Sequence, residues 1–266
     1  MWYNEPNYNV RKGHTMEHIR VPEEHSRTAR VLGADAIDRL AQARVIVFGV
    51  GGVGGNLCEA LARAGVGHIT LVDRDVVSLS NINRQVVALH STVGRPKVEV
   101  MAERIRDINP ACEVITHEMF YLPETADAFD LSAYDYVADA VDTMSAKLEL
   151  AVRCDRLGVP LIAAMGAGNK LYPERFVVTD LYKTTTDPLA RIMRRELKAR
   201  GVKRLRVVCS DEPPVPVAYT PEGEKPVTGS LAFVPAVMGL VMAGEIVRTL
   251  AASQTAPPHG VERALN

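Results

Sequence analysis

The amino-acid sequence predicts a doubly wound α/β fold, in which a mainly parallel sheet carries helices on both faces. Two observations support this prediction. Apolar, strand-like runs alternate with helical patterns along much of the chain, and closely spaced glycines stand between the first run and the helix that follows it. Because parallel strands must be joined by crossovers, this alternation is typical of a parallel sheet. The 266 residues, 47% of them apolar, suffice for one large domain or one domain with an appendage.

The first five strands are predicted where short apolar runs occur, at residues 45–48, 68–72, 113–116, 136–138 and 160–164. The helices between them are predicted at residues 56–64, from Pro96 to Asn109, and at 146–157. Pro110 stops the second of these helices, and Gly158 ends the third. Beyond residue 168 the pattern predicts a strand (175–179), an amphipathic helix from Leu189, another strand (206–209) and a proline-rich connection (213–226).

The two ends of the chain differ from the region between them. We expect residues 1–22 to form a mobile extension, because they are polar, mixed in charge and without the apolar core of a signal peptide. Residues 23–252 then form a single domain, and residues 253–266 are expected to be a disordered tail. Residues 231–244 carry no charge but are short for a membrane span. For the segment 231–250 we therefore favour a buried or dimer-facing helix over membrane contact.

Charge and cysteine usage exclude several classes of function. Lysine plus arginine (31) nearly balance aspartate plus glutamate (32), so a nucleic-acid partner would have to be bound by a local basic patch. The four cysteines lie far apart without any CxxC pair, which excludes the common zinc spacings and a disulfide framework. This usage fits a reducing compartment, and we expect a cytoplasmic protein.

The glycine-rich turn at residues 49–54 reads Gly-Val-Gly-Gly-Val-Gly and follows the first predicted strand. Such a turn lets the backbone approach phosphate oxygens, and the following helix presents its unpaired N–H groups to them. The turn is shared by dinucleotide-binding Rossmann-like domains and by several ATP sites, so it leaves the nucleotide open. Its candidate binding residues are Gly49, Gly51, Gly52 and Gly54.

The residues after the second strand narrow the choice of nucleotide. Asp73 closes that strand, where a carboxylate can accept both ribose hydroxyls, and Asp73-Arg74-Asp75 is followed by Asn-Ile-Asn-Arg-Gln at residues 81–85. Arg84 and Lys97 supply two cations beside the phosphates. A redox enzyme has no need of them, whereas phosphoryl chemistry requires cations where negative charge develops. The set therefore indicates ATP.

A carboxylate for Mg²⁺ is expected at the same edge of the sheet, because ATP chemistry commonly uses a hard cation held by one or two carboxylates. Asp139 and Asp142 follow the fourth predicted strand. Of the two, we favour Asp142 as the magnesium ligand.

These motifs together resemble the adenylating domain of ubiquitin-activating enzymes and of the bacterial MoeB and ThiF proteins. The resemblance runs from about Ser26 to Leu250 and also includes Gly-Arg-Pro-Lys-Val-Glu at residues 94–99. It implies that residues 23–252 are one adenylating domain, with a substrate-facing segment at 169–230. It also implies a homodimer in which an N-terminal arginine, Arg27 or second Arg30, reaches the partner's site. The implied catalytic residues are Arg84, Lys97, Asp142 and Arg27, and the implied ATP-binding set is Gly49, Gly51, Gly52, Gly54, Asp73, Asp75, Asn81, Asn83, Arg84, Gln85, Lys97 and Asp142.

One branch of this superfamily is favoured by the segment at 178–190, Val-Thr-Asp-Leu-Tyr-Lys-Thr-Thr-Thr-Asp-Pro-Leu-Ala, with Gly-Ala-Gly at 166–168 before it. The segment resembles the tRNA threonylcarbamoyladenosine dehydratases. That resemblance implies that ATP activates the threonine carboxylate of the modified adenosine, and that ring closure then expels AMP. Whether Na⁺ or K⁺ is also needed stays open.

A basic segment gives the tRNA hypothesis an independent basis. Between residues 191 and 206 basic side chains greatly outnumber the single acid, Glu196, and apolar residues at helical spacing would turn them outward. Such a stripe could follow an RNA backbone, although a solvated helix face has the same pattern. The candidate RNA-binding residues are Lys183, Arg191, Arg194, Arg195 and Lys198.

Two alternatives remain. The first is an enzyme that activates the C-terminus of a ubiquitin-like sulfur carrier; most such relatives carry two CxxC pairs, which this chain lacks. The second is an ATP-binding scaffold that holds a cysteine desulfurase or sulfur-acceptor partner without turnover. Cys209 falls two residues from the position where some relatives carry a cysteine, so we favour a bystander over a nucleophile. Ring closure by an internal nitrogen needs positioning and no protein thiol.

Overall fold

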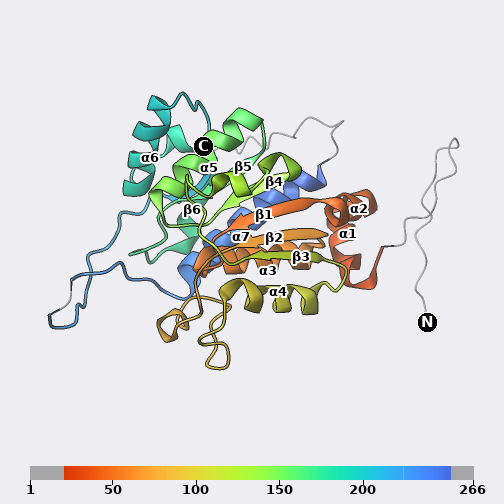
Figure 1. Cartoon of the computed structure of the whole chain (residues 1–266), viewed down its shortest axis with the longest axis horizontal. Helices are drawn as coiled ribbons and strands as arrows, with labels where there is room; N and C mark the ends of the chain where they lie inside the picture. Colours follow the sequence, from red (N-terminus) through yellow and green to blue (C-terminus); the bar gives the residue numbers. More distant parts are fainter. Residues whose placement is uncertain (1–20, 224, 253–266) are drawn as a thin grey trace, which may run out of the picture.

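The computed structural model describes residues 21–223 and 225–252 and contains one seven-stranded sheet. The strands are β1 (Arg44–Phe48), β2 (His68–Val72), β3 (Glu113–His117), β4 (Tyr136–Asp139), β5 (Leu161–Ala164), β6 (Phe176–Asp180) and β7 (Arg206–Ser210). Their order is β3-β2-β1-β4-β5-β7-β6, and all neighbours are parallel except β6 and β7 (Figure 1). From β1 the chain adds β2 and β3 on one side of the sheet, and from β4 it adds the remaining strands on the other side. Sheets of α/β proteins bind ligands at the carboxyl ends of the strands beside such a switch point.

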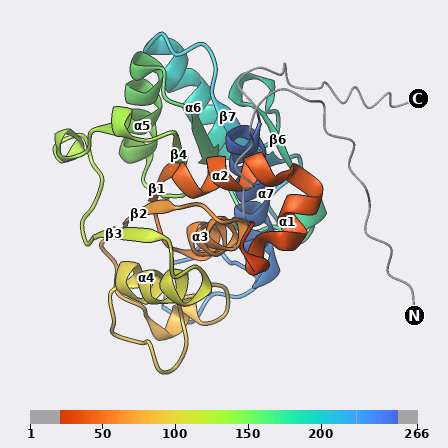
Figure 2. The same ribbon diagram turned by 90° about the vertical axis from the view of Figure 1, so that its right-hand side faces the viewer.

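Helices cover both faces of the sheet. They are α1 (Ser26–Leu32), α2 (Ala34–Gln42), α3 (Gly52–Ala64), α4 (Lys97–Ile108), α5 (Met144–Leu157), α6 (Pro188–Ala199) and α7 (Phe233–Ala251). One apolar core joins the sheet to α3, α4 and α7, and a second joins its other face to α5 and α6. Figure 2 shows α5 and α6 on the opposite side of the strands from α3 and α4. The predicted fold, doubly wound with a mainly parallel sheet, is confirmed.

Short 3₁₀ turns connect the larger elements. They are η1 (Glu23–His25), η2 (Leu79–Asn81), η3 (Ala126–Ala128), η4 (Leu131–Ala133), η5 (Pro173–Arg175) and η6 (Leu181–Lys183). The predicted disordered tail and nearly all of the predicted N-terminal extension lie outside the described residues. Helices α1 and α2 were not predicted, because each is only two turns long and the first buries no residue.

Helix α7 contains all but the first two residues of the uncharged segment for which a buried or dimer-facing helix was predicted. Its residues Val234, Met238, Met242 and Ile246 are buried in the first core. At Gly239 a Cβ atom would lie 2.3 Å from the carbonyl oxygen of Val53, so glycine permits the close approach of α7 to α3. Among the described residues α7 is the one helix long and apolar enough for a membrane span, but a buried face of this kind is typical of a core helix.

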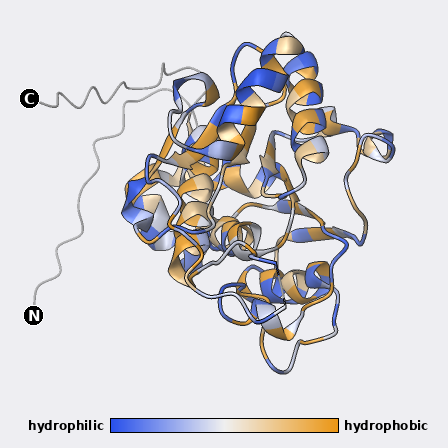
Figure 3. Cartoon of the chain, turned by 90° about the vertical axis from the view of Figure 1, so that its left-hand side faces the viewer, coloured by the Kyte–Doolittle hydropathy of each residue, from blue (hydrophilic) through white to orange (hydrophobic). Residues whose placement is uncertain are grey.

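Surface helices are amphipathic, and α6 is a clear case. Ala190, Met193 and Leu197 are buried against the second core, while charged residues take the outer positions. Figure 3 shows this alternation of hydrophobic and hydrophilic segments along the helical ribbons. Asp187 caps the helix by accepting hydrogen bonds from the backbone N–H groups of Ala190 and Gly166 at 3.0 and 2.9 Å. The cap ties α6 to the carboxyl end of β5.

Candidate nucleotide-binding site

A cavity of about 360 Å³ lies at the carboxyl ends of β1, β2 and β4. It brings together most of the predicted ATP-binding residues, which come from five separate parts of the chain. Those that line it are Gly49, Gly51, Gly52, Asp73, Asp75, Asn81, Arg84, Gln85, Lys97 and Asp142. The predicted residues Gly54 and Asn83 do not line it.

The glycine-rich turn is held tightly at both ends. Gly49 has a φ of +89°, and a Cβ atom there would lie 2.6 Å from the carbonyl oxygen of Ala140. A Cβ atom at Gly54 would lie 1.8 Å from the oxygen of Gly49, so glycine is needed there for the packing of the turn. Gly51 differs, because a Cβ atom there would meet nothing closer than 3.8 Å. The space above Gly51 therefore belongs to the cavity.

Asp73 connects the end of β2 to this turn. One carboxylate oxygen accepts a hydrogen bond from the backbone N–H of Val50 at 2.6 Å, and the other accepts from that of Asp75 at 2.8 Å. A carboxylate offers about four acceptor sites, so both oxygens can still accept ribose hydroxyls. The side chain is thus fixed before any ligand binds.

Lys97 is the first residue of α4 and is 5% exposed. Its Nζ donates to the carboxylate of Asp75 at 2.7 Å, and its backbone N–H donates to the carbonyl oxygen of Asp75 at 2.9 Å. Burial of an ammonium group is costly unless it is paired, and Asp75 provides the partner. Asp75 therefore places the cation beside the cavity and the N-terminus of α4.

Arg84 is held by two acceptors on its own segment. Its Nη1 donates to the carbonyl oxygen of Ser80 at 2.9 Å and to the side-chain oxygen of Asn83 at 2.8 Å. Asn83 uses its amide nitrogen to donate to the carbonyl oxygen of Ser230 at 3.0 Å. Asn83, predicted as an ATP ligand, therefore supports Arg84 and contacts the segment before α7.

The two candidate magnesium ligands have different environments. Asp139 is fully buried, and the Nζ of Lys147, itself 1% exposed, lies 2.9 Å from each of its carboxylate oxygens. Burial raises the pKa of Asp139 and the adjacent Lys147 opposes that shift. Asp142 is exposed and lines the cavity, where its carboxylate can meet a cation. The position of Asp142 in the cavity lining agrees with the preference stated above.

No group of three or more metal-binding side chains occurs within the described part of the chain. A divalent cation at Asp142 would therefore take most of its ligands from phosphate oxygens and water, as Mg²⁺ does in many nucleotide sites.

One buried polar atom of a lining residue fits a polar ligand. The side-chain oxygen of Gln85 has no hydrogen-bond partner among the described residues. Buried polar groups are normally paired, so the lining fits a ligand with donors and acceptors such as a nucleoside. The Arg74 guanidinium lies 5.0 Å from the ring centre of Phe120, and both residues line the cavity.

Sequence reasoning did not identify the wall that follows β3. Met119, Phe120 and Tyr121 lie there, and the only signal for them was their place after a predicted strand. The edge strand β3 has no motif beyond its end, so a pattern search passes over these residues.

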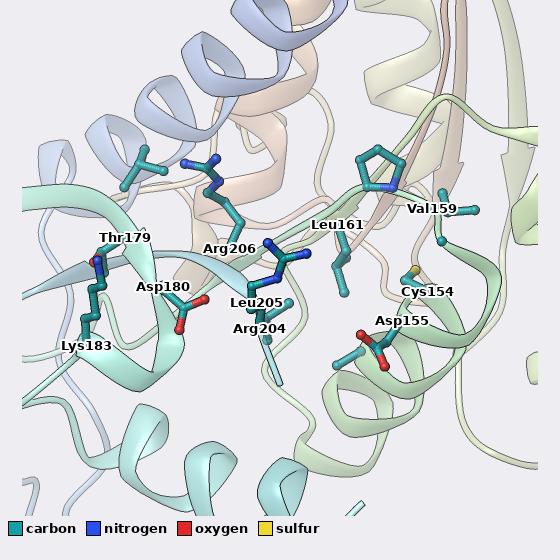
Figure 4. Close-up of a pocket in the computed structure, with 14 residues that line it drawn as sticks. Cys154, Asp155, Val159, Leu161, Thr179, Asp180, Lys183, Arg204, Leu205 and Arg206 are labelled. Atoms are coloured by element: carbon teal, nitrogen blue, oxygen red, sulfur yellow. The ribbon is translucent and has the colours of Figure 1, made fainter. Parts of the chain in front are cut away.

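A second cavity, of about 680 Å³, lies at the amino ends of β5 and β7, away from the glycine-rich turn. Figure 4 shows Lys183, Arg204 and Arg206 together with Asp155 and Asp180 around it. The predicted RNA contact Lys183 thus lies at the opposite edge of the sheet from the nucleotide cavity, because β6 is antiparallel and carries the chain back to that edge. This cavity has no glycine-rich turn, and acids offset its cations.

The other predicted RNA contacts lie on α6. Arg191, Arg195 and Lys198 are exposed, whereas Arg194 is partly buried. Arg194 donates from Nη1 to the carbonyl oxygen of Thr184 at 2.8 Å, which fixes the segment before α6. Three of the four helix cations are therefore accessible, and Arg194 has a structural contact.

Arg27 and Arg30 lie on α1 and are exposed, and neither lines the cavity of its own chain. In Figure 1, α1 lies at the right, whereas the carboxyl ends of the strands lie at the left. An arginine on α1 could reach a nucleotide only in another subunit, so its role in a dimer stays a prediction.

Cys209 is 5% exposed, and burial raises the pKa of its thiol to about 11. At neutral pH it is protonated and a poor nucleophile. Cys58, Cys112 and Cys154 are also buried. These environments agree with a bystander role for Cys209.

Comparison with known proteins identifies the family. A family model described as the ThiF family matches residues 25–265. The chain belongs to the ThiF family. The resemblance inferred from the motifs is thereby confirmed.

Within the ThiF family the chain is most usefully compared with three proteins. The tRNA threonylcarbamoyladenosine dehydratase of Bacillus subtilis (strain 168) is 45% identical over 237 residues, which are 85% of this chain and 93% of the relative. A crystal structure of the E. coli dehydratase, TcdA, in complex with ATP has a TM-score of 0.78 at 38% identity and covers 86% of this chain and 93% of that one. The molybdopterin-synthase adenylyltransferase of Escherichia coli (strain K12) is 37% identical over 129 residues, only 48% of this chain and 51% of the relative. The similarity to the dehydratases is therefore higher and far more extensive.

Proposed function

We propose that this ThiF-family protein is an ATP-dependent tRNA threonylcarbamoyladenosine dehydratase. The observation that carries the proposal is the convergence of Asp73, Arg84 and Lys97 in one cavity at the carboxyl edge of the sheet. These residues form a ribose acceptor and two phosphate-binding cations. The substrate is supported by the 45% identity to the B. subtilis dehydratase along nearly its whole length.

The reaction begins with attack of the threonine carboxylate on the α-phosphorus of ATP. A P–O bond forms to the carboxylate, and the bond to pyrophosphate breaks. Charge develops on the phosphate oxygens, where Arg84 and Lys97 stabilise it. Asp142 would hold Mg²⁺, which neutralises phosphate charge when it is bound.

The second step closes a ring. An internal nitrogen of the threonylcarbamoyl group attacks the acyl carbon, loses its proton to water, and AMP leaves with the former carboxylate oxygen. The nucleoside has then lost one water. The protein has to align the nitrogen with the acyl carbon, and this alignment alone can supply a large acceleration.

The proposed partners follow from the surface. Arg191, Arg195 and Lys198 would contact tRNA phosphates, so tRNA affinity should fall steeply with salt. We also propose a homodimer in which Arg27 reaches the partner's cavity, with Arg30 as the second candidate. A subunit carrying Arg27→Ala and one carrying Lys97→Ala, each inactive alone, should recover activity on mixing. Absence of recovery in a mixed dimer would exclude an arginine acting between subunits.

The function is tested by AMP formation in the presence of Mg²⁺ and ATP with four additions: tRNA carrying threonylcarbamoyladenosine, tRNA lacking the modification, a Gly-Gly-ending sulfur carrier, and no substrate. We expect AMP only with the modified tRNA. Carrier-dependent pyrophosphate exchange would favour the sulfur-carrier activator, and the absence of turnover with every addition would favour a nucleotide-binding scaffold.

A further inference from the structure

The segment between β7 and α7, residues 213–230, contains five prolines and projects from the molecule; we call it the proline loop. In Figure 1 it extends to the left, on the side of the carboxyl ends of the strands, and α6 lies above it on the same side. Because proline fixes φ, such a loop loses less freedom on ordering than an ordinary loop of its length. It is suited to hold a side chain in place at some distance from the sheet.

The base of the proline loop is closed on a single residue, Asn169. The carbonyl oxygen of Asn169 accepts a hydrogen bond from the N–H of Val215 at 2.7 Å, and its side-chain oxygen accepts from the N–H of Gly229 at 2.7 Å. The backbone N–H of Asn169 also donates to the oxygen of Gly229 at 2.9 Å. Asn169 adopts a φ of +54°, the one positive value at a non-glycine position among the described residues. Both ends of the loop are therefore fastened at the same point.

Two further contacts place this base beside the nucleotide cavity. A Cβ atom at Gly168 would lie 2.1 Å from the methyl group of Thr228, so glycine lets the loop pack directly on the segment that follows β5. Next to Gly229, the carbonyl oxygen of Ser230 accepts the hydrogen bond from Asn83, which in turn supports Arg84. The loop thus starts and ends at the rim of the cavity where ATP is proposed to bind.

The outer part of the loop presents an aromatic ring. Tyr219 is 80% exposed, the highest value among the exposed aromatic side chains of the described residues. A large aromatic side chain held in solvent on a fastened loop gives no stability to the fold. Proteins that bind single-stranded RNA stack unpaired bases on such rings, beside cations that contact the phosphates. The exposed cations of α6 lie on the same side of the molecule.

We infer that Tyr219 is a stacking platform for an unpaired base of the tRNA next to the modified adenosine. The inference rests on the proposed function, since it assumes that the substrate is single-stranded RNA presented at the rim of the cavity. Tyr219 would bind and orient the RNA, and it would take no part in the chemistry of the carboxylate.

The experiment measures binding and turnover separately. The dissociation constant for an RNA hairpin that carries the modified adenosine in its unpaired loop is compared between the wild type, Tyr219→Ala and Tyr219→Phe, with Val217→Ala on the same loop as the matched control. We expect Tyr219→Ala to weaken binding about tenfold, the effect of losing one stacked base, while Tyr219→Phe and Val217→Ala stay within about twofold. ATP affinity should be unchanged in all four proteins.

An abasic substitution identifies the contact. Removing the base on one side of the modified adenosine should weaken wild-type binding by the same factor as Tyr219→Ala, and Tyr219→Ala should add nothing on that RNA. Equal RNA affinity of the wild type and Tyr219→Ala overturns the inference, whether or not the oligomeric state changes. If RNA binds as expected but no AMP forms, the proposed function fails while the stacking contact stands.

Discussion

The buried ion pair of Asp139 and Lys147 allows the most quantitative prediction of stability. Both side chains are at most 1% exposed, and the Lys147 ammonium lies 2.9 Å from each oxygen of Asp139. In Lys147→Met the carboxylate would stay buried without its cation. Because a fully buried carboxylate would lose its charge partner, we expect the free energy of unfolding to fall by about 3–5 kcal/mol, a large part of the stability of a typical domain.

The loss should depend on pH, and the structure gives the sign. Burial raises the pKa of Asp139 and Lys147 opposes the shift, so removal of Lys147 raises the pKa further. A carboxyl group whose pKa is higher in the folded state binds a proton more tightly there, so stability falls as pH rises through the interval between the unfolded and folded pKa values. The penalty of Lys147→Met should therefore be largest near pH 8 and shrink as the pH is lowered towards 5.

The assay is urea unfolding at several pH values, with two controls. The exposed lysine variant Lys198→Met should change stability by no more than about 0.5 kcal/mol. The double variant Asp139→Asn with Lys147→Met removes both charges, keeps an acceptor for the N–H of Val141, and should recover most of the loss. A cost below about 1 kcal/mol for Lys147→Met at pH 8, or a cost that is the same at pH 5, would refute the reasoning.

Two further predictions concern the cavity, and a third concerns Cys209. Lys97→Ala should reduce AMP formation by about 10²–10³-fold, because a phosphate-binding cation is lost. The free energy of unfolding should change by less than about 1 kcal/mol, because the partner Asp75 is exposed. A larger loss of stability together with normal turnover of the folded fraction would contradict this. Gly49→Ala should abolish ATP binding in an equilibrium binding assay, because its methyl group would meet the oxygen of Ala140 at 2.6 Å; wild-type affinity would show that the turn can shift freely. Cys209→Ala should keep full turnover. In the wild type, the rate of Cys209 alkylation should rise about tenfold per pH unit from 8 to 10, since the pKa of its thiol is about 11. An alkylation rate that levels off near pH 8 would instead reveal an activated thiol.

The sequence predicted the strands well because their signal is local. Each of the seven predicted strands agrees with the structure within one residue at either end, since short apolar runs between helical patterns define them. The start of α3 was placed too late, at Asn56, because glycines are poor helix formers, yet Gly52 begins the helix. Helices α1 and α2 were not predicted: α1 buries no residue, and α2 buries Ala36, Ile37 and Leu40 but is only nine residues long.

The site was predictable where residue type and order carry the chemistry, as for Asp73, Arg84 and Lys97. It was not predictable where three-dimensional neighbours decide the role of a residue. Asp139 and Asp142 are three positions apart with the same side chain; the sequence analysis favoured Asp142, but only the structure shows that Asp139 is paired with Lys147. Asn83 and Gly54 belong to the motifs but support the site from behind. Lys183 lies away from the nucleotide cavity, because the antiparallel strand β6 carries the chain to the opposite edge of the sheet.

The central claim is that the cavity activates the carboxylate of threonylcarbamoyladenosine in tRNA with ATP. It is tested most directly by mass analysis of the nucleosides of the modified tRNA before and after incubation with the protein, Mg²⁺ and ATP. We predict that the threonylcarbamoyladenosine is replaced by a nucleoside lighter by one water, with one AMP formed for each nucleoside converted, and that Lys97→Ala prevents both. An unchanged nucleoside in the presence of protein that binds ATP and the tRNA would contradict the account.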